Sequence, residues 1–263
     1  MMHKAKLDDV IAIAKRAGEA IVAVYEHDVE VQHKQDSSPL TQADLIAHDI
    51  IESGLAALIP ELPVLSEESA AIPFSTRRQW GSYWLVDPLD GTREFIKRNG
   101  EFTVNIALIE NHRPVMGVVY APVLDLLFFA ASGQGAFKQS DNMPPQAIHV
   151  RKYDAAQITI AGSRSHAGEE LRHFLDHIGP HVLISMGSSL KICLVAEGQA
   201  DVYPRLGLTS EWDTAAAQCV LEEAGGRLVD MNGAAFCYNM KESLLNPHFF
   251  AVGAGEHDWT QYL

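Results

Sequence analysis

The sequence predicts an α+β protein made of two halves, residues 1–145 and 146–263. The first half has two helical patterns followed by a run of apolar strands, which is typical of helices packed on a largely antiparallel sheet. The second half alternates strands with helices, as an α/β arrangement does. Between them, the polar and proline-rich segment 138–150 is the best candidate for a boundary.

Two helices are predicted in the first half. Apolar residues recur at helical spacing over residues 7–25, and a second helix begins near residue 41 and runs until Pro60. Between these helices, residues 29–41 alternate and end in turn formers, which indicates a strand and a loop.

The rest of the first half is predicted to be mostly strands. Residues 63–69 form a short strand that ends in acids, and the apolar run 84–87 is the next strand. Residues 102–138 are expected to form three antiparallel strands joined by turns at 111–114 and 122–125. A short helix is expected over 93–98.

The second half is predicted to alternate throughout. Strands are expected over 158–163, 182–187, 200–205 and 227–230, and helices over 168–179, 188–198 and 213–226.

Composition limits the function. The 263 residues are 47% hydrophobic, enough for a substantial core, and the formal net charge is −14. This charge disfavours sequence-independent binding to nucleic acid or to an anionic membrane. A polyanionic substrate would need locally placed cations.

Cysteine usage and the N-terminus indicate a cytoplasmic protein. Cys193, Cys219 and Cys237 are widely spaced and form no C-x-x-C motif, so a disulfide framework or a structural zinc site is not expected. Charged residues interrupt the apolar pattern of residues 1–18, so that segment is neither a signal sequence nor a membrane span. Loose peripheral attachment to the cytoplasmic face of the inner membrane stays open, as does the oligomeric state.

Acidic residues cluster at the ends of predicted elements. Glu67 and Glu68 follow one strand, Asp87 and Asp90 follow the next, and Asp213 opens a helix. Loops converge on functional sites at such ends.

The segment 87–90 is informative because Pro88 restricts both its own backbone and that of Asp87, making a rigid turn. Such a turn can aim two carboxylates at one point and also present a backbone carbonyl. Like charges so close are costly unless a cation lies between them, and hard divalent ions prefer oxygen ligands. The chemistry indicated is Mg²⁺ binding.

Each acidic cluster also has an ordinary structural explanation. The D-P-x-D-G pattern at 87–91 is a common turn composition, and residues 41–44 resemble a capping box at a helix start. Asp213 fits a plain helix N-cap, and Glu67 with Glu68 fits a solvated loop. The occurrence of all of them in one chain favours a site.

The order of the acidic motifs resembles that of the Mg²⁺-dependent, Li⁺-sensitive phosphatase superfamily. These motifs are Asp44, the acids at 67–68, DPLDGT at 87–92 and WDTAA at 212–216. This superfamily includes inositol monophosphatases, fructose-1,6-bisphosphatases and 3'(2'),5'-bisphosphate nucleotidases. Within it, segments 83–109, 163–166, 187–205 and 243–247 are similar to bacterial bisphosphate nucleotidases. The resemblance covers roughly residues 7–250. It implies a layered α-β-α-β-α sandwich of the sugar phosphatase or inositol monophosphatase type, with the site between the halves.

The resemblance also implies the metal ligands. One Mg²⁺ would bind Glu67, Asp87 and the backbone carbonyl of Leu89, and a second would bind Asp87, Asp90 and Asp213. Asp87 would thus bridge the two ions, and a third, weaker ion would join through Glu67.

The implied catalytic residues are Asp44, Thr92 and Glu67. Asp44 and Thr92 would act together on the attacking water as proton acceptor. The implied reaction removes the 3'-phosphate from adenosine 3',5'-bisphosphate to give AMP and phosphate. The sulfated relative 3'-phosphoadenosine 5'-phosphosulfate is a further expected substrate, which would link the enzyme to sulfate assimilation.

Substrate contacts are expected from both halves. The strand-to-helix turn at 187–191 is a reasonable anion site, and Arg205 would add charge on the nucleotide. The full set of expected substrate-binding residues is Glu67, Leu89, Asp90, Gly91, Thr92, Ser163, Arg164, His166, Gly187, Ser188, Lys191, Arg205 and Asp213.

Two other functions stay open. An inositol or other sugar monophosphatase would share the metal cluster and differ only in how the rest of the substrate is bound. A non-catalytic regulatory protein that kept the fold would be expected to have lost some of the acidic ligands, yet all of them are present.

Overall fold

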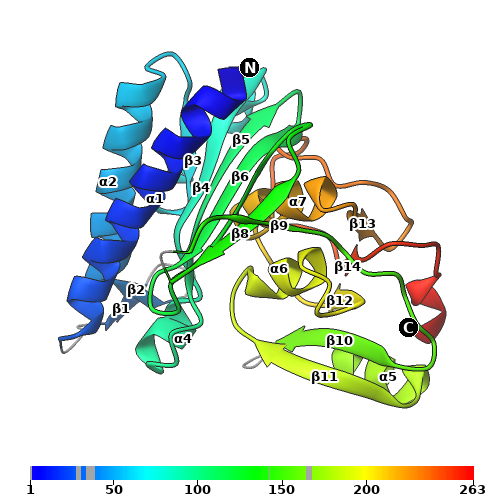
Figure 1. Cartoon of the computed structure of the whole chain (residues 1–263). Helices are drawn as coiled ribbons and strands as arrows, with labels where there is room; N and C mark the ends of the chain where they lie inside the picture. The colour runs from blue at the N-terminus through cyan, green and yellow to red at the C-terminus, as the bar shows by residue number, and fades with distance from the viewer. Residues whose placement is uncertain (1, 28–30, 34–38, 142, 164–167) are drawn as a thin grey trace.

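The computed structural model describes residues 2–27, 31–33, 39–141, 143–163 and 168–263. Two β-sheets alternate with three layers of helices (Figure 1), which confirms the expected α-β-α-β-α order. Helices α1 and α2 cover one face of the larger sheet, α6 and α7 lie between the sheets, and α5 covers the outer face of the smaller sheet.

The outer helical layer follows the apolar periodicity of the sequence. Helix α1 spans Met2–Tyr25 and α2 spans Gln42–Leu58, close to the predicted ranges. Their inward stripes are fully buried against the larger sheet, and include Val10, Ala14 and Ile51. A two-stranded ribbon, β1 (Val31–His33) with β2 (Pro39–Thr41), precedes α2.

The larger sheet has seven strands in chain order: β3 (Val64–Ser66), β4 (Ser82–Asp90), β5 (Thr103–Glu110), β6 (Arg113–Ala121), β7 (Leu126–Ala131), β8 (Ala136–Ser140) and β9 (Gln146–Ile148). Only the β3–β4 pair is parallel among them.

The prediction of three strands over residues 102–138 is wrong, because four strands begin there. The turn between β7 and β8 contains Gly133 and Gly135, both with positive φ, and it allows a tight reversal that the apolar pattern alone does not mark. The segment 138–150 also contributes β9 and the end of β8 to this sheet. The division of the chain at 145/146 stays a prediction.

The smaller sheet has the strand order β11 (His181–Met186), β10 (Ile158–Ser163), β12 (Val202–Arg205), β14 (Phe249–Val252) and β13 (Arg227–Asp230). Strand β14 has no counterpart among the predicted strands, and it pairs antiparallel with both neighbours. Its four residues are all buried, and a short apolar run without alternation does not identify a strand. The sheet is therefore mixed rather than parallel.

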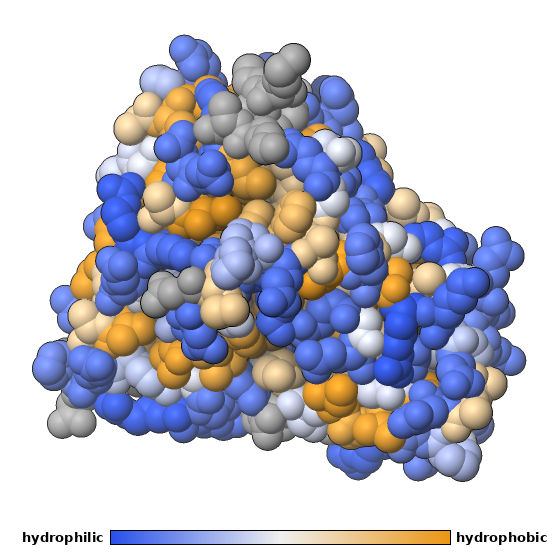
Figure 2. Space-filling view, viewed as in Figure 1, coloured by the Kyte–Doolittle hydropathy of each residue, from blue (hydrophilic) through white to orange (hydrophobic). Residues whose placement is uncertain are grey.

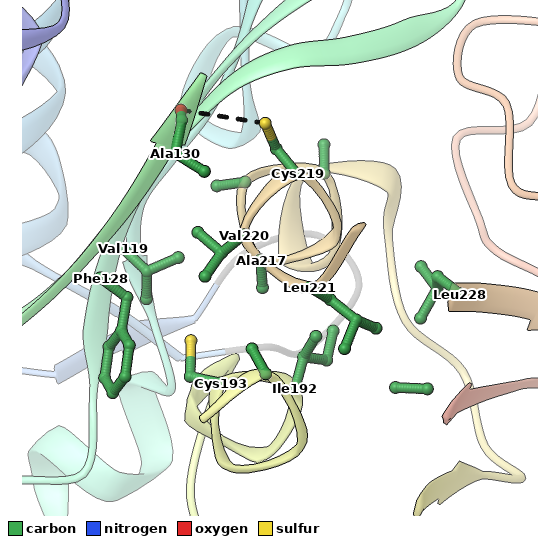
Figure 3. Packing of buried hydrophobic residues seen from close by; sticks show 14 of the residues in the cluster. Val119, Phe128, Ala130, Ile192, Cys193, Ala217, Cys219, Val220, Leu221 and Leu228 are labelled. Atoms are coloured by element: carbon green, nitrogen blue, oxygen red, sulfur yellow. Dashed lines mark hydrogen bonds between the residues drawn. The ribbon is translucent and has the colours of Figure 1, made fainter. Parts of the chain in front are cut away.

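The helices of the second half are α5 (Glu169–Ile178), α6 (Leu190–Ala196) and α7 (Ala215–Glu223), with the 3₁₀ turn η3 (Trp259–Tyr262) beside α5. Figure 3 shows the central layer: Val119 and Phe128 reach from the larger sheet toward Cys193 on α6 and Val220 on α7, and Leu228 faces them from the smaller sheet. The Cys219 thiol lies 3.9 Å from the Ala130 carbonyl oxygen. One continuous core thus joins the two halves.

Most residues on the face seen in Figure 1 are hydrophilic, with smaller hydrophobic patches among them (Figure 2). Within the described part of the chain, no helix is both long and apolar enough to cross a membrane. The remaining short elements are α3 (Phe74–Arg77), α4 (Thr92–Ile96) and the 3₁₀ turns η1 (Glu67–Ser69) and η2 (Glu211–Asp213).

Gly117 on β6 should be intolerant of a side chain. A Cβ atom there would lie 2.2 Å from the Ala216 carbonyl oxygen and 2.9 Å from the Cys219 Cβ, both on α7. We expect Gly117→Ala to lower the free energy of unfolding by about 3 kcal/mol, because α7 must move away from the sheet. Denaturant unfolding measures this effect. Gly81→Ala is the matched control, since a Cβ at Gly81 meets nothing within 4 Å. Equal midpoints for the two variants would contradict the prediction.

Candidate active site

A cavity of about 440 Å³ is lined by residues of both halves. Most of the residues predicted to form the site line it: Glu67, Asp87, Leu89, Asp90, Gly91, Thr92, Ser163, Ser188, Lys191, Arg205 and Asp213. Asp44 lies behind Thr92, and Gly187 belongs to the turn that carries Ser188. Arg164 and His166 lie outside the described residues.

The end of β4 forms the floor of the site. The pairing of β4 with β5 is irregular between Asp87 and Asp90, where Pro88 cannot donate to the ladder. Within this bulge, the Leu89 amide donates a 3.0 Å hydrogen bond to Asp87 Oδ1, which closes the rigid turn. Gly91 then takes a left-handed conformation, φ 93°, at the start of α4. The turn thus directs both carboxylates toward the cavity.

Three carboxylates meet at this floor. Asp87, Asp90 and Asp213 each offer one oxygen, and these oxygens all lie within 4.8 Å of one another. Burial raises the pKa of Asp87 well above its usual range, and the negative charges of Glu67, Asp90, Asp213 and Asp44 raise it further. Burial and the Asp90 charge likewise raise the pKa of Asp213. The cluster is therefore unfavourable by itself, and oxygen ligands at this spacing fit divalent cations.

Asp213 reaches the cluster from η2 rather than from a helix N-cap. Its Oδ2 accepts a 2.9 Å hydrogen bond from the Ser210 amide, which closes a capping box within the 3₁₀ turn. Helix α7 begins two residues later, with Thr214 at its N-cap.

Asp90 is contacted from the second half. The Ser189 amide donates a 2.6 Å hydrogen bond to Asp90 Oδ2. Burial raises the pKa of Asp90, while the Lys191 charge, the Ser189 amide, the neighbouring Asn105 side chain and the Arg205 charge lower it. Because the Ser189 amide is bound to Asp90, it is not the free anion donor that the 187–191 turn suggests.

Asp44 makes both contacts that the sequence offered as alternatives. Its Oδ2 accepts hydrogen bonds from the Thr41 amide at 2.8 Å and from Thr41 Oγ1 at 2.6 Å, as in a capping box. Its Oδ1 accepts from Thr92 Oγ1 at 3.4 Å. Asp44 is buried, 2% exposed. Its Oδ2 caps the start of α2, and its Oδ1 faces Thr92 at the site.

The basic wall of the cavity is formed by Lys191 and Arg205. Lys191 Nζ donates to the Ser188 carbonyl oxygen at 2.5 Å and lies 5.5 Å from the centre of the Tyr203 ring. Burial lowers the pKa of Lys191 to about 8, although the Asp90 carboxylate opposes this effect. Arg205 Nη2 donates to the Leu208 carbonyl oxygen at 2.7 Å.

Several lining or supporting residues were missed from the sequence. Leu208, Trp212 and Leu245 form an apolar part of the lining, and Thr103 and Asn105 contact Ser189 beneath it. A signal for the last two was present: they are polar at alternating positions at the start of β5, and the strand is then apolar until Glu110.

The sequence matches the inositol monophosphatase family over residues 4–258. The chain is 51% identical over 245 residues to the 3'(2'),5'-bisphosphate nucleotidase CysQ of Escherichia coli strain K12, covering 92% of this chain and 98% of that protein. It is equally similar, with the same coverage, to CysQ of Salmonella typhimurium. Among solved structures, CysQ from Bacteroides thetaiotaomicron, a bacterial member of the inositol monophosphatase family, is 41% identical with a TM-score of 0.83, covering 96% of this chain and 98% of that one.

Proposed function

The chain belongs to the inositol monophosphatase family, and we propose that within it the chain is a metal-dependent 3'(2'),5'-bisphosphate nucleotidase. It removes the 3'-phosphate from adenosine 3',5'-bisphosphate to give AMP and phosphate. The observation that carries this proposal is the meeting of the Asp87, Asp90 and Asp213 carboxylates at the floor of a cavity that also has a basic wall. The similarity to CysQ proteins over nearly their whole length supports the substrate.

We propose Mg²⁺ as the metal, with two ions and a third at Glu67. Glu67, Asp87 and the Leu89 carbonyl would hold the first ion, and Asp87, Asp90 and Asp213 would hold the second. When bound, such ions neutralise the phosphate oxygens and lower the pKa of a water molecule. Glu67 and Asp87 line the cavity beside Leu89, so the chain supplies oxygens only, as Mg²⁺ prefers.

The proton of the attacking water passes to Thr92 and Asp44. Thr92 Oγ1 donates its own proton toward Asp44 Oδ1. The lone pairs of the Thr92 hydroxyl can therefore accept a hydrogen bond from a water in the cavity. The water oxygen bonds to phosphorus as the bond from phosphorus to O3' breaks. Asp44 is placed to accept the proton of this water because its Oδ1 lies 3.4 Å from Thr92 Oγ1. The O3' oxygen takes up a proton from solvent to become the hydroxyl of AMP, and Asp44 releases its proton to solvent.

The remainder of the nucleotide occupies the far side of the cavity. We propose that Lys191 and Arg205 bind the 5'-phosphate, since both line the cavity and their charges act on Asp90. The adenine ring would lie on Leu208, Trp212 and Leu245; Leu208 is 70% exposed and Leu245 43%, so apolar surface is available to a base.

The direct test is phosphate release from a small panel of substrates with Mg²⁺ titrated. We expect hydrolysis of adenosine 3',5'-bisphosphate, and of 3'-phosphoadenosine 5'-phosphosulfate as a second substrate, with loss of activity in EDTA. Faster hydrolysis of inositol 1-phosphate would identify an inositol or sugar monophosphatase instead. Absence of release from every substrate would favour a regulatory protein. A role in sulfate assimilation, a cytoplasmic location and any peripheral membrane attachment stay predictions.

Lys191→Met should separate the two phosphates of the substrate. We expect its KM for adenosine 3',5'-bisphosphate to rise about ten- to a hundredfold, because one charge-assisted contact is lost. For adenosine 3'-monophosphate, which lacks the 5'-phosphate, the KM should change little. Steady-state kinetics at saturating Mg²⁺ measures both values, with the exposed Lys152→Met as the matched control. An equal rise for the two substrates would assign Lys191 to the scissile phosphate or to the fold.

A further inference from the structure

We propose that Thr103 and Asn105 are positioning residues for the metal site, which act through Ser189 to orient the Asp90 carboxylate. The inference rests on the proposed function for its kinetic part only, since metal binding can be measured without a substrate. None of these three residues belongs to the expected set of ligands or substrate contacts.

The contact between β5 and the turn 187–189 is regular. Thr103 and Asn105 are two residues apart on β5, so their side chains share one face of the strand, and Glu101 lies just before it. Each meets the turn. Glu101 Oε2 accepts from the Gly187 amide at 2.8 Å, Thr103 Oγ1 donates to Ser188 Oγ at 3.1 Å, and Ser189 Oγ donates to Asn105 Oδ1 at 2.9 Å. The turn of the second half is thereby fixed along the strand of the first.

Ser189 is the centre of this arrangement. Its hydroxyl lies 2.9 Å from Thr103 Oγ1 and also donates to Asn105, while its amide donates to Asp90 Oδ2. Asp90 in turn pairs with Thr103 in the β4–β5 ladder, just beyond the bulge. The hydroxyl contacts therefore determine where the amide points, and the amide determines how Asp90 presents its other oxygen.

The burial of these polar groups argues for a specific role. Thr103, Asn105 and Ser189 are 0%, 1% and 3% exposed. Further along the same face of β5, Ala107 and Ile109 are apolar and belong to the central core. Buried hydroxyls and amides cost free energy unless they are hydrogen-bonded, so an apolar pair at 103 and 105 would be the simpler solution for packing alone. The polar pair occurs only at the end of the strand beside the acidic cluster.

The backbone of the turn 187–189 also needs stabilising contacts from outside the turn. Ser188 has a φ of 45°, in the left-handed region that disfavours residues other than glycine. The Thr103 hydroxyl donates to Ser188 Oγ and lies 2.9 Å from Ser189 Oγ, and these two contacts stabilise this conformation. Without them, the turn would relax and withdraw the Ser189 amide from Asp90.

The test compares Thr103→Val with Thr103→Ser in the full-length protein. Valine keeps the shape and removes the hydroxyl, whereas serine retains it. We expect Thr103→Val to weaken Mg²⁺ binding about tenfold, measured by calorimetry with Mg²⁺ alone, at the lower end of the effects of residues that support metal ligands. Thr103→Ser should bind Mg²⁺ within about twofold of the wild type. At saturating Mg²⁺, kcat should fall while the KM for the nucleotide stays unchanged.

Two further variants keep the test decisive. Ser189→Ala removes only the linking hydroxyl and should weaken Mg²⁺ binding in the same direction, which covers the case that Thr103→Val does not fold. Thr159→Val, at a buried threonine on β10, should alter stability without altering Mg²⁺ affinity. The proposal would be overturned if Thr103→Val and Ser189→Ala both bound Mg²⁺ as tightly as the wild type and had lower melting temperatures. The hydrogen bonds would then contribute only to stability. Normal Mg²⁺ binding by the wild type without hydrolysis would instead contradict the proposed function.

Discussion

Asp87→Asn is expected to lower Mg²⁺-dependent phosphate release by about a thousandfold, the upper end of the range for loss of one electrostatic group. Asp87 is the proposed bridge between both ions, and an amide there cannot supply a second negative oxygen. The turn should survive, because the asparagine oxygen can still accept from the Leu89 amide. Phosphate release measured over a Mg²⁺ titration tests the effect. Asp8→Asn, on the exposed side of α1, is the control.

The same substitution should stabilise the metal-free protein. Burial and neighbouring carboxylates raise the pKa of Asp87, so the folded chain holds this proton more tightly than the unfolded chain. The contribution of Asp87 to stability therefore falls as pH rises from the ordinary carboxyl pKa through the raised value. We expect the melting temperature of metal-free Asp87→Asn to exceed that of the wild type, by a margin that grows with pH. A melting temperature well below the wild type in EDTA would mean that lost activity reflects misfolding.

Asp44→Asn should remove turnover and leave metal binding intact. We expect kcat to fall by about a hundred- to a thousandfold, the range for losing a proton acceptor. The asparagine oxygen can replace Oδ2 opposite the two Thr41 donors, which leaves an NH₂ group facing Thr92. That group cannot accept the proton of Thr92 Oγ1. The measurement is kcat at saturating substrate, together with Mg²⁺ affinity by calorimetry.

Variants of Thr92 provide the matched comparison. Thr92→Ser retains the hydroxyl that faces Asp44 Oδ1 and should keep most of the activity, whereas Thr92→Val should resemble Asp44→Asn. Because the two residues act as one unit, the double variant should be little slower than either single variant. Normal turnover in Asp44→Asn with unchanged Mg²⁺ affinity would refute the role assigned to this pair.

The local features of the chain were predictable because they follow from residues close in sequence. The periodicity of residues 7–25 and 41–59 predicted α1 and α2, since a helix buries every third or fourth residue. The acids at the end of β4 were recognisable because Pro88 stiffens the turn between them. The resemblance carried by these motifs also implied the five-layer order, which the structure confirms.

Features that depend on distant residues were not predictable in this way. Strand β14 lies between β12 and β13 although it follows both in the chain, and nothing within its four apolar residues specifies that position. The turn between β7 and β8 differs, because its signal was local: the turn formers at 132–135 lie between two apolar strands and were not recognised as a break. Strand order depends on which faces bury each other, and that is a property of the assembled layers.

The sequence was sufficient to identify the acids of the site and the chemistry that such acids support. Residue type is given directly by the sequence, and the geometry of a local turn depends only on neighbouring residues. The hydrogen bond between Thr92 and Asp44, 48 residues apart, and the contacts of Ser189 with Thr103, 86 residues apart, exist only once the layers pack. A hydrogen bond requires its donor and acceptor to approach within about 3 Å, and only packing of the whole chain brings groups so distant in sequence that close. The hydrogen bond from the Ser189 amide to Asp90 therefore could not be predicted, because Ser189 lies in the second half of the chain and the DPLDGT motif of Asp90 lies in the first.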